Sequence, residues 1–500
     1  MKIGISSLLL LIVFFFIFLS SSVGLMNSVD SPQYRLTQSI ADNHKINIDK
    51  NTKYIYPDYI FYNNHYYSSR EPTESLLAIP FYVGAKLLSR FAYLPYNGNN
   101  PGIDQNSKVE SLTISLNALC AALSVLIIFY FGLLTTKHLY ISNLGAISYG
   151  LGSLIWCYGG TFQRQSELSF LISSYFALLF LFLLKQYQSQ KIYFFLGILI
   201  GLSVALDRTW TVIIFLTLPF VYIKSTNHKY IFWYLFGLLL TNFPSLVYYY
   251  VIFNNPFTSS FSHLNEFPLF TSFKQAFSSP LASVVINLFS FGPIPKWATS
   301  PLLWNQSLSS GHLNFSVNYA TTYPYKGIFT QSPYLYIAII SLLTTLRKSN
   351  FSRLVILCMA AMTLVYSKLV GYWNPNNYNT RYFLPIVTVL STYFPLSISY
   401  LNSKIKPQYK YSFYLILLIV ISISIYFGYS ALLSNYGPHI TGEHRYIPTN
   451  NLNELITNLF PNYQNALFLS TIFLPFFLII CAYLSKKYHR YLKTTQNISL

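Results

Sequence analysis

The chain has 500 residues, 53% hydrophobic and 9% charged, with a formal net charge of +19 at pH 7. Soluble domains carry about 25% charged residues, so this composition excludes a soluble globular protein and indicates a polytopic membrane protein. The basic residues are scattered between apolar runs, which indicates membrane orientation and not nucleic-acid binding. No C-x-x-C spacing occurs, so neither a disulfide framework nor a zinc site is predicted from the four cysteines: Cys120, Cys157, Cys358 and Cys481.

The first apolar run covers about residues 3–23 and follows Lys2. It is longer than the roughly 7–15 residues of a signal-peptide core, so we expect a retained first span, with a signal peptide as the alternative. Asp30, the first acidic residue, follows in "GLMNSVDSPQYRL". It is a solvated loop residue, the N-cap of a helix that begins near Pro32, or a functional group, because ionisable groups at a membrane are costly.

Thirteen apolar runs can be counted, and the run at 75–94 differs from the others. It contains Pro80, Gly84, Lys86 and Arg90, and its charges recur at helical spacing, as in a helix that lies along the membrane surface. The other runs predict twelve spans: about 3–23, 111–134, 140–158, 168–184, 192–207, 209–223, 230–253, 333–346, 354–370, 382–400, 411–432 and 466–484.

Charge supports this count. With the N-terminus inside and 75–94 not crossing, the inner segments hold sixteen Lys and Arg residues and none of the 13 acidic ones. If 75–94 crossed, every later loop would change sides and this segregation would be lost. The model is one membrane domain, 1–500, with three large external pieces at about 24–110, 254–332 and 434–465. Because all carboxylates lie outside, we expect the protein to work on that face.

Several ionisable residues lie at the predicted outer ends of spans. Arg164 and Glu167 in "TFQRQSE" either form a local ion pair or place a second carboxylate in the same cavity as Asp30. Arg208 in "ALDRTWT" is either an interface anchor or a phosphate ligand. A lone cation at such a position is usually an anchor, but arginine suits bidentate phosphate binding. Five cations together predict a basic pocket above the bilayer: Arg70, Arg164, Arg208, Lys326 and Arg381.

Short motifs add a resemblance to a known class. They are an acid and a tyrosine after the first span, then "EPTESLLAIPFYVGAKLL", "TFQRQSE", "YPYKGIFTQSPYLY" and "NTRYFLPIV". With these motifs the chain resembles the GT-C type membrane glycosyltransferases, specifically the protein O-mannosyltransferase and aminoarabinose-transferase-like, family 39-like group. The resemblance implies an all-α polytopic membrane protein with about 12 transmembrane helices and a long first external loop that carries interfacial helices.

The resemblance also implies roles for individual residues. Asp30 would be the catalytic base and Glu167 a second carboxylate of the catalytic site, while Tyr34 and Tyr382 would contact substrate. The five cations would bind the donor phosphate, with Arg70 in place of a lysine that many members have. Many members also have two adjacent acids where this chain has Asp30 and Ser31. A divalent metal is compatible with the resemblance, but no metal or other cofactor is predicted here.

The residue inventory supports the same chemistry. A polyprenyl- or dolichyl-phosphate sugar has a phosphate leaving group, which needs cations, and the acceptor hydroxyl needs one base. We therefore expect an inverting transfer to a protein, lipid or glycan acceptor on the extracytoplasmic side of the plasma membrane. One alternative is a transporter or lipid flippase, which would favour charges near mid-membrane and internal symmetry. The other is a non-catalytic membrane scaffold.

Overall fold

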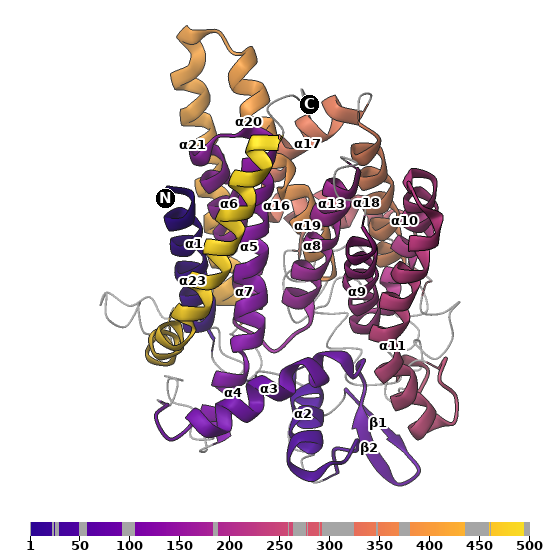
Figure 1. The fold of residues 1–500 in the computed structure, drawn as a ribbon. Coiled ribbons are helices and arrows are strands. Elements are labelled where there is room, and N and C mark those ends of the chain that lie inside the picture. Colours follow the sequence, from indigo (N-terminus) through magenta and orange to yellow (C-terminus); the bar gives the residue numbers. More distant parts are fainter. Residues whose placement is uncertain are drawn as a thin grey trace.

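The computed structural model describes residues 2–22, 25, 30–49, 58–92, 106–183, 189–258, 260–263, 277, 279–289, 291–292, 325–346, 349–369, 381–435, 460 and 462–494. Within them the chain forms a helical bundle with a smaller layer across one end (Figure 1). The bundle contains α1 (Lys2–Ser20), α5 (Ser115–Thr136), α6 (Leu139–Gly152), α7 (Ile155–Gly159), α8 (Gln165–Leu183), α9 (Gln190–Leu206), α10 (Thr211–Lys224), α11 (Ile231–Phe253), α17 (Tyr334–Leu346), α18 (Asn350–Lys368), α19 (Leu384–Ser391), α20 (Tyr393–Lys404), α21 (Lys410–Asn435) and α23 (Tyr463–Thr494).

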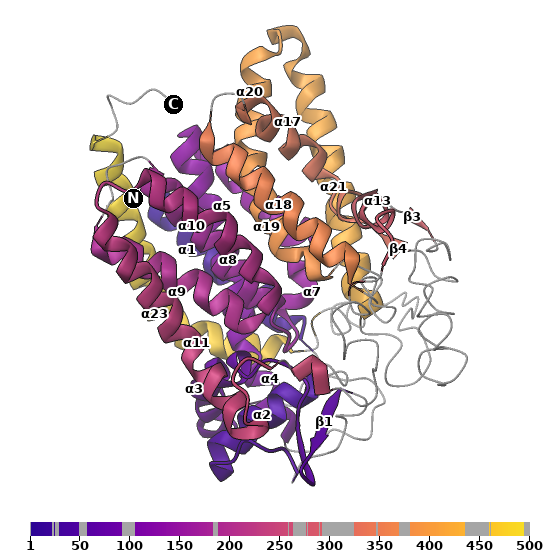
Figure 2. The ribbon, with the colours of Figure 1, turned by 90° about the vertical axis from the view of Figure 1, so that its right-hand side faces the viewer.

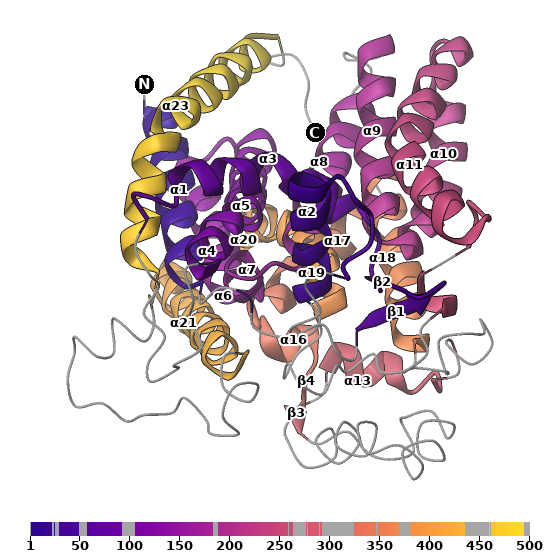
Figure 3. The same cartoon turned by 90° about the horizontal axis from the view of Figure 1, so that it is seen from below.

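The end layer is built from the segment after α1. It contains α2 (Ser31–Asn43), β1 (Tyr59–Tyr62), β2 (His65–Ser68), α3 (Thr73–Leu88) and α4 (Asn106–Thr113). Seen from below in Figure 3, α2, α3 and α4 lie across the end of the bundle. The antiparallel hairpin pairs Tyr59 with Ser68 and Tyr62 with His65. Its turn uses Asn63 and Asn64 at φ 49° and 62°, a left-handed conformation that asparagine tolerates well.

Short elements connect the bundle helices. They are η1 (Arg208–Trp210), η2 (His228–Tyr230), η3 (Ser260–His263), α13 (Ser283–Phe289), β3 (Phe291–Gly292), β4 (Tyr325–Lys326), α16 (Ile328–Gln331), η6 (Arg381–Phe383) and η7 (Pro407–Tyr409). Strands β3 and β4 pair antiparallel. Figure 2 shows them next to α13, which packs against α16 and α18. Most of the predicted external pieces 254–332 and 434–465 lie outside the described residues.

The expectation of a helical, multi-span membrane protein is confirmed. Every run predicted to cross falls on helical segments, and seven helices of the described chain are long and apolar enough to span. The count is eight if Arg381–Ser391 and Tyr393–Lys404, which meet at a 41° bend, form one span. The count of twelve is not confirmed, because some runs contain breaks. At about 1.5 Å per residue, the 14 residues of α6 are too short for a hydrocarbon core of about 30 Å.

The helices α9 and α11 pack backbone to backbone through glycine. A Cβ added to Gly197 would lie 2.0 Å from the carbonyl oxygen of Tyr234, and one added to Gly237 would lie 2.5 Å from that of Phe194. Contacts this close form only where a side chain is absent, and small residues are the usual means of close helix packing in membranes. The neighbouring α1 and α23 also pack side by side, so the two ends of the chain meet in one wall of the bundle (Figure 1).

Gly197→Val should destabilise the protein by several kcal/mol, because the new side chain meets backbone that cannot move aside. Thermal unfolding of the purified protein in detergent measures this as a lower melting temperature. Gly84→Ala in α3 is the matched control, since a Cβ there meets nothing within 4 Å and alanine is the better helix former. An unchanged melting temperature for Gly197→Val would contradict the observed close packing of α9 on α11.

Candidate active site

A small pocket lies where the starts of α8 and η6 meet the end layer. It is lined by Gln33, Arg70, Gln163, Arg164, Gln165, Arg381 and Tyr382. Three of the five predicted cations therefore come together here, with one of the two predicted substrate-binding tyrosines. The three arginine residues are each less than one-tenth exposed. Buried cations attract an anion more strongly than cations in water do.

Each of these arginines stands just before a helix. Arg70 comes three residues before α3, Arg164 directly precedes α8, and Arg381 opens η6, which leads into α19. Prolines help the chain to enter two of these helices, at the start of α3 and in the first turn of α19. The positive end of a helix dipole and its unpaired amides favour anions. The arginine side chains and the helix N-termini around the pocket are therefore both positive, and both favour an anion.

Two aspartates hold two of the arginines in place. Arg70 Nη2 lies 3.0 Å from Asp58 Oδ1, and Arg164 Nη2 lies 3.1 Å from Asp207 Oδ2. Arg164 Nη1 also donates to the carbonyl oxygen of Leu206 at 2.8 Å. Both ion pairs are almost fully buried, so the orientation of each guanidinium is restricted. Neither aspartate was predicted from the sequence to have this role.

Asp30 lies beside the pocket and is fully buried. It occupies the predicted N-cap position of α2, which begins at Ser31, but its side chain makes no capping hydrogen bond. Asp30 Oδ1 instead accepts a hydrogen bond of 2.7 Å from Gln163 Nε2. Gln163 Oε1 in turn accepts one of 3.4 Å from Arg381 Nη1. A single amide therefore joins the predicted base to a predicted phosphate ligand.

Two further carboxyl groups are buried behind the pocket. Glu167 Oε1 accepts a hydrogen bond of 2.8 Å from Asn117 Nδ2, and Arg164 pairs with Asp207 instead of forming the local pair with Glu167. Glu74 in α3 is also fully buried, and neither of its oxygens has a hydrogen-bond partner at normal geometry. Burial raises the pKa of Glu74; nearby Arg164 lowers it and Asp30 raises it further. Among the described residues, no group of three or more His, Cys, Asp and Glu side chains is arranged to hold a metal ion.

Glu74→Gln should raise the melting temperature relative to wild type increasingly as pH rises. A carboxyl whose folded pKa is raised binds its proton more tightly in the folded state, so its contribution to stability is lost as pH rises above the ordinary carboxyl range. Glutamine does not titrate, and it keeps the size of the side chain. Melting temperatures of both proteins between about pH 5 and pH 9 test this. A difference that is constant with pH would contradict the prediction.

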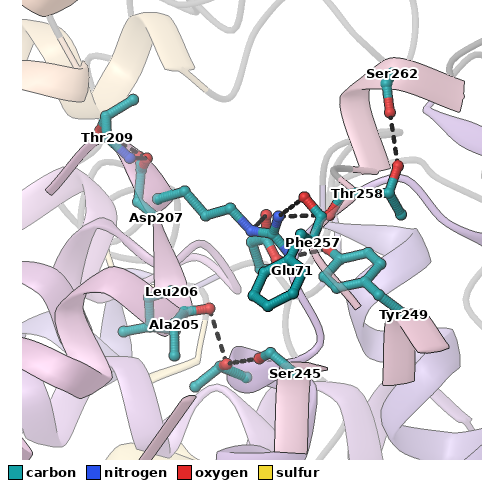
Figure 4. Close-up of polar contacts among 12 residues, drawn as sticks. Glu71, Ala205, Leu206, Asp207, Thr209, Ser245, Tyr249, Phe257, Thr258 and Ser262 are labelled. Atoms are coloured by element: carbon teal, nitrogen blue, oxygen red, sulfur yellow. Dashed lines mark hydrogen bonds and ion pairs between the residues drawn. The ribbon is translucent and has the colours of Figure 1, made fainter. Parts of the chain in front are cut away.

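Arg208 lies apart from the pocket lining. Its Nε is 3.2 Å from Glu71 Oε1, its guanidinium lies 4.5 Å from the centre of the Tyr249 ring, and Nη1 donates to the carbonyl oxygens of Phe257 and Thr258. Figure 4 shows Glu71 and Tyr249 beside the backbone of Phe257; Tyr249 donates a 2.5 Å hydrogen bond to Glu71. Burial raises the pKa of Glu71, and Arg208 lowers it. Arg208 therefore ties the end layer to the segment that follows α11.

The remaining predicted residues fall in different places. Tyr382 lines the pocket, and its hydroxyl accepts a 3.0 Å hydrogen bond from Arg381 Nη2. Tyr34 is outside the lining and packs edge-on against Tyr82 and Phe162. Lys326 belongs to the short strand β4, and its side chain lies outside the described residues. The three lining glutamines were missed, although Gln163 and Gln165 stand in the polar "TFQRQSE" segment between apolar runs.

Comparison with models of known protein families gives no match, and neither does comparison with curated proteins. Among solved structures, the chain is similar to the archaeal oligosaccharyltransferase AglB from Archaeoglobus fulgidus in complex with an inhibitory peptide and a dolichol-phosphate, at 14% identity, with 86% of this chain and 56% of that chain covered and a TM-score of 0.48. It is also similar to ArnT from Cupriavidus metallidurans bound to undecaprenyl phosphate, at 11% identity, with 93% and 75% covered and a TM-score of 0.46.

The chain thus spans little more than half the length of AglB and three quarters of that of ArnT. At these identities the likeness concerns the fold alone.

Proposed function

We propose that this chain is a GT-C-like membrane glycosyltransferase, which moves a sugar from a polyprenyl- or dolichyl-phosphate donor to an acceptor hydroxyl. The observation that carries the proposal is the convergence of Arg70, Arg164 and Arg381 on one pocket, with Asp30 joined to Arg381 through Gln163. This arrangement provides several cations and one base. A phosphate leaving group and a hydroxyl nucleophile need these two kinds of group.

The chemistry follows from these roles. Asp30 accepts the proton of the acceptor hydroxyl, and the hydroxyl oxygen forms a bond to the anomeric carbon of the sugar. The bond from that carbon to the phosphate oxygen breaks, and the lipid phosphate leaves as an anion stabilised by the arginines. Since the leaving group is already a weak base, no general acid is required. One displacement of this kind inverts the configuration at the anomeric carbon.

The position of the pocket supports a lipid-linked donor. It lies at one end of the bundle, between the starts of α8 and η6 and the layer of α2 and α3. A donor would place its phosphate in the pocket and its apolar tail among the helices. The segregation of carboxylates from the basic inner segments favours the extracytoplasmic side of the plasma membrane for this face.

A transporter or lipid flippase is less well supported. Such proteins use charged groups or broken helices near the middle of the membrane. Here Arg164, Arg381 and Glu167 belong to the starts of their helices, and Asp207 follows the end of α9. The ionisable cluster is therefore gathered at helix ends, as expected for a site that works at the membrane surface.

A transfer assay with purified protein in lipid nanodiscs tests the proposal. The protein is supplied with radiolabelled polyprenyl-phosphate hexose or pentose and with a panel of peptide, lipid and glycan acceptors. We expect release of free polyprenyl phosphate together with labelled product, and a product anomer opposite to that of the donor. Folded wild-type protein that turns over no donor in this panel would contradict the proposal. Retention of the donor configuration would contradict the single displacement.

A further inference from the structure

Gln163 is hydrogen-bonded at both ends of its side chain. It lies in the turn between α7 and α8 and is 2% exposed. Its Nε2 donates to Asp30 at 2.7 Å, and its Oε1 accepts from Arg381 at 3.4 Å. Its backbone carbonyl oxygen accepts a 3.0 Å hydrogen bond from Asn117 Nδ2. Both ends of the side chain and the main chain are therefore held at once.

The two partners determine which way the amide points. An ionised carboxylate only accepts hydrogen bonds, and a guanidinium only donates them. The amide must therefore turn its nitrogen to Asp30 and its oxygen to Arg381. Glutamate at this position would bring a second acceptor against Asp30, and asparagine is one methylene too short to reach both groups. Methionine has the same length but neither donates nor accepts strongly.

The main chain of Gln163 is anchored independently of its side chain. Asn117 in α5 donates both to the Gln163 carbonyl oxygen and to Glu167 Oε1, at 3.0 and 2.8 Å. All three residues are at most 2% exposed. The main chain at Gln163 is thus anchored to α5 and, through Asn117, to Glu167 in the first turn of α8.

We propose that Gln163 is a positioning residue that sets the distance between the base Asp30 and the donor phosphate held at Arg381. The inference rests on the proposed function. Reaction rates depend steeply on the placement of base and leaving group, and a displacement of about 1 Å costs on the order of 100-fold. Because Gln163 contacts both Asp30 and Arg381, it keeps the acceptor side of the site at a fixed distance from the donor side.

Substitution of Gln163 should affect the rate of catalysis much more than the binding of the donor. Gln163→Met should lower kcat by about 100-fold, while the KM for the lipid donor and the dissociation constant of polyprenyl phosphate stay within about threefold, because the three arginines remain. Gln163→Glu should lower kcat further, since it places a negative charge against Asp30. Its carboxylate also pairs with Arg381, so donor affinity should fall as well, but by less than kcat. Substitution of a purely structural residue would not lower kcat in this order, with the glutamate variant slower than the methionine variant.

Gln331→Met is the matched control. Gln331 is also a glutamine at 2% exposure, in α16, and donates a 2.8 Å hydrogen bond to the carbonyl oxygen of Phe427. We expect it to retain the wild-type kcat. Melting temperatures show whether each variant is folded, and Gln163→Glu serves as the test if Gln163→Met is not.

Two results would overturn the inference: a wild-type kcat in a folded Gln163→Met protein, or a loss of donor affinity that matches the loss of kcat. If the wild type is active and Asp30→Asn is inactive, either result would rule out the positioning role of Gln163 but leave the proposed function intact. If the wild-type protein turns over no donor, both the positioning role of Gln163 and the proposed function are ruled out.

Discussion

Asp30→Asn should lower kcat for sugar transfer by about 1,000-fold, while the protein keeps its fold and its affinity for the lipid donor. General-base catalysis contributes about 100- to 10,000-fold, and the amide of asparagine cannot accept the acceptor proton. The side chain keeps its size, and its oxygen can still accept the hydrogen bond from Gln163 Nε2. Release of labelled polyprenyl phosphate under saturating donor and acceptor measures kcat, and thermal unfolding measures the fold.

Asp49→Asn is the matched control for this change. Asp49 belongs to the same end layer and carries the same functional group, but it is a third exposed and is paired with His65 at 2.6 Å. We expect it to transfer sugar at the wild-type rate. Undiminished transfer by Asp30→Asn would remove Asp30 as the base. Equal losses in both variants would point to a general disturbance of the end layer.

Arg381→Met should lower kcat/KM by about 100- to 1,000-fold, the range found when one group that stabilises transition-state charge is removed. Arg381 lines the pocket, is 4% exposed, and contacts both Gln163 and Tyr382. Its loss should weaken binding of polyprenyl phosphate as well as slow the reaction, which distinguishes it from Asp30→Asn. Arg381→Lys should recover only part of the activity, because lysine keeps the charge but not the planar fork.

Arg353→Met controls for the loss of a positive charge. Arg353 lies in α18, in a segment predicted to be inside, where its Nε donates to the carbonyl oxygen of Leu346. Steady-state rates and binding of polyprenyl phosphate should both match wild type. Wild-type kcat/KM in Arg381→Met would show that the phosphate is bound elsewhere.

The basic pocket was predicted only in part from the sequence. Each candidate cation was chosen because it stands at the outer end of an apolar run. Arg70, Arg164 and Arg381 do meet in one pocket, whereas Arg208 lies apart and pairs with Glu71. The run of hydrophobic residues determines how deep a side chain lies along the bundle axis. It does not determine which way the helix faces, so residues at equal depth can be neighbours or lie on opposite sides.

The partners of these site residues could be predicted even less well from the sequence. Gln163, Asp58 and Asp207 have ordinary sequence neighbours, and the contacts that define their roles join residues 133, 12 and 43 positions away. A hydrogen bond between distant segments leaves no periodic signal in a single sequence. The same applies to Tyr34, which follows the expected acid but is turned into an aromatic cluster and not into the pocket.

The sequence by itself determined the class of molecule, a helical membrane protein, and it predicts a basic inner side with the carboxylates outside. These properties follow from the length of apolar runs and from the cost of placing charge in hydrocarbon, and both are local. Only the tertiary structure decided which of the charged residues converge, how many helices are long enough to span, and that one buried glutamine bridges Asp30 and Arg381. These depend on how the helices are rotated and packed against one another, and packing is decided by contacts between residues that are far apart in the chain.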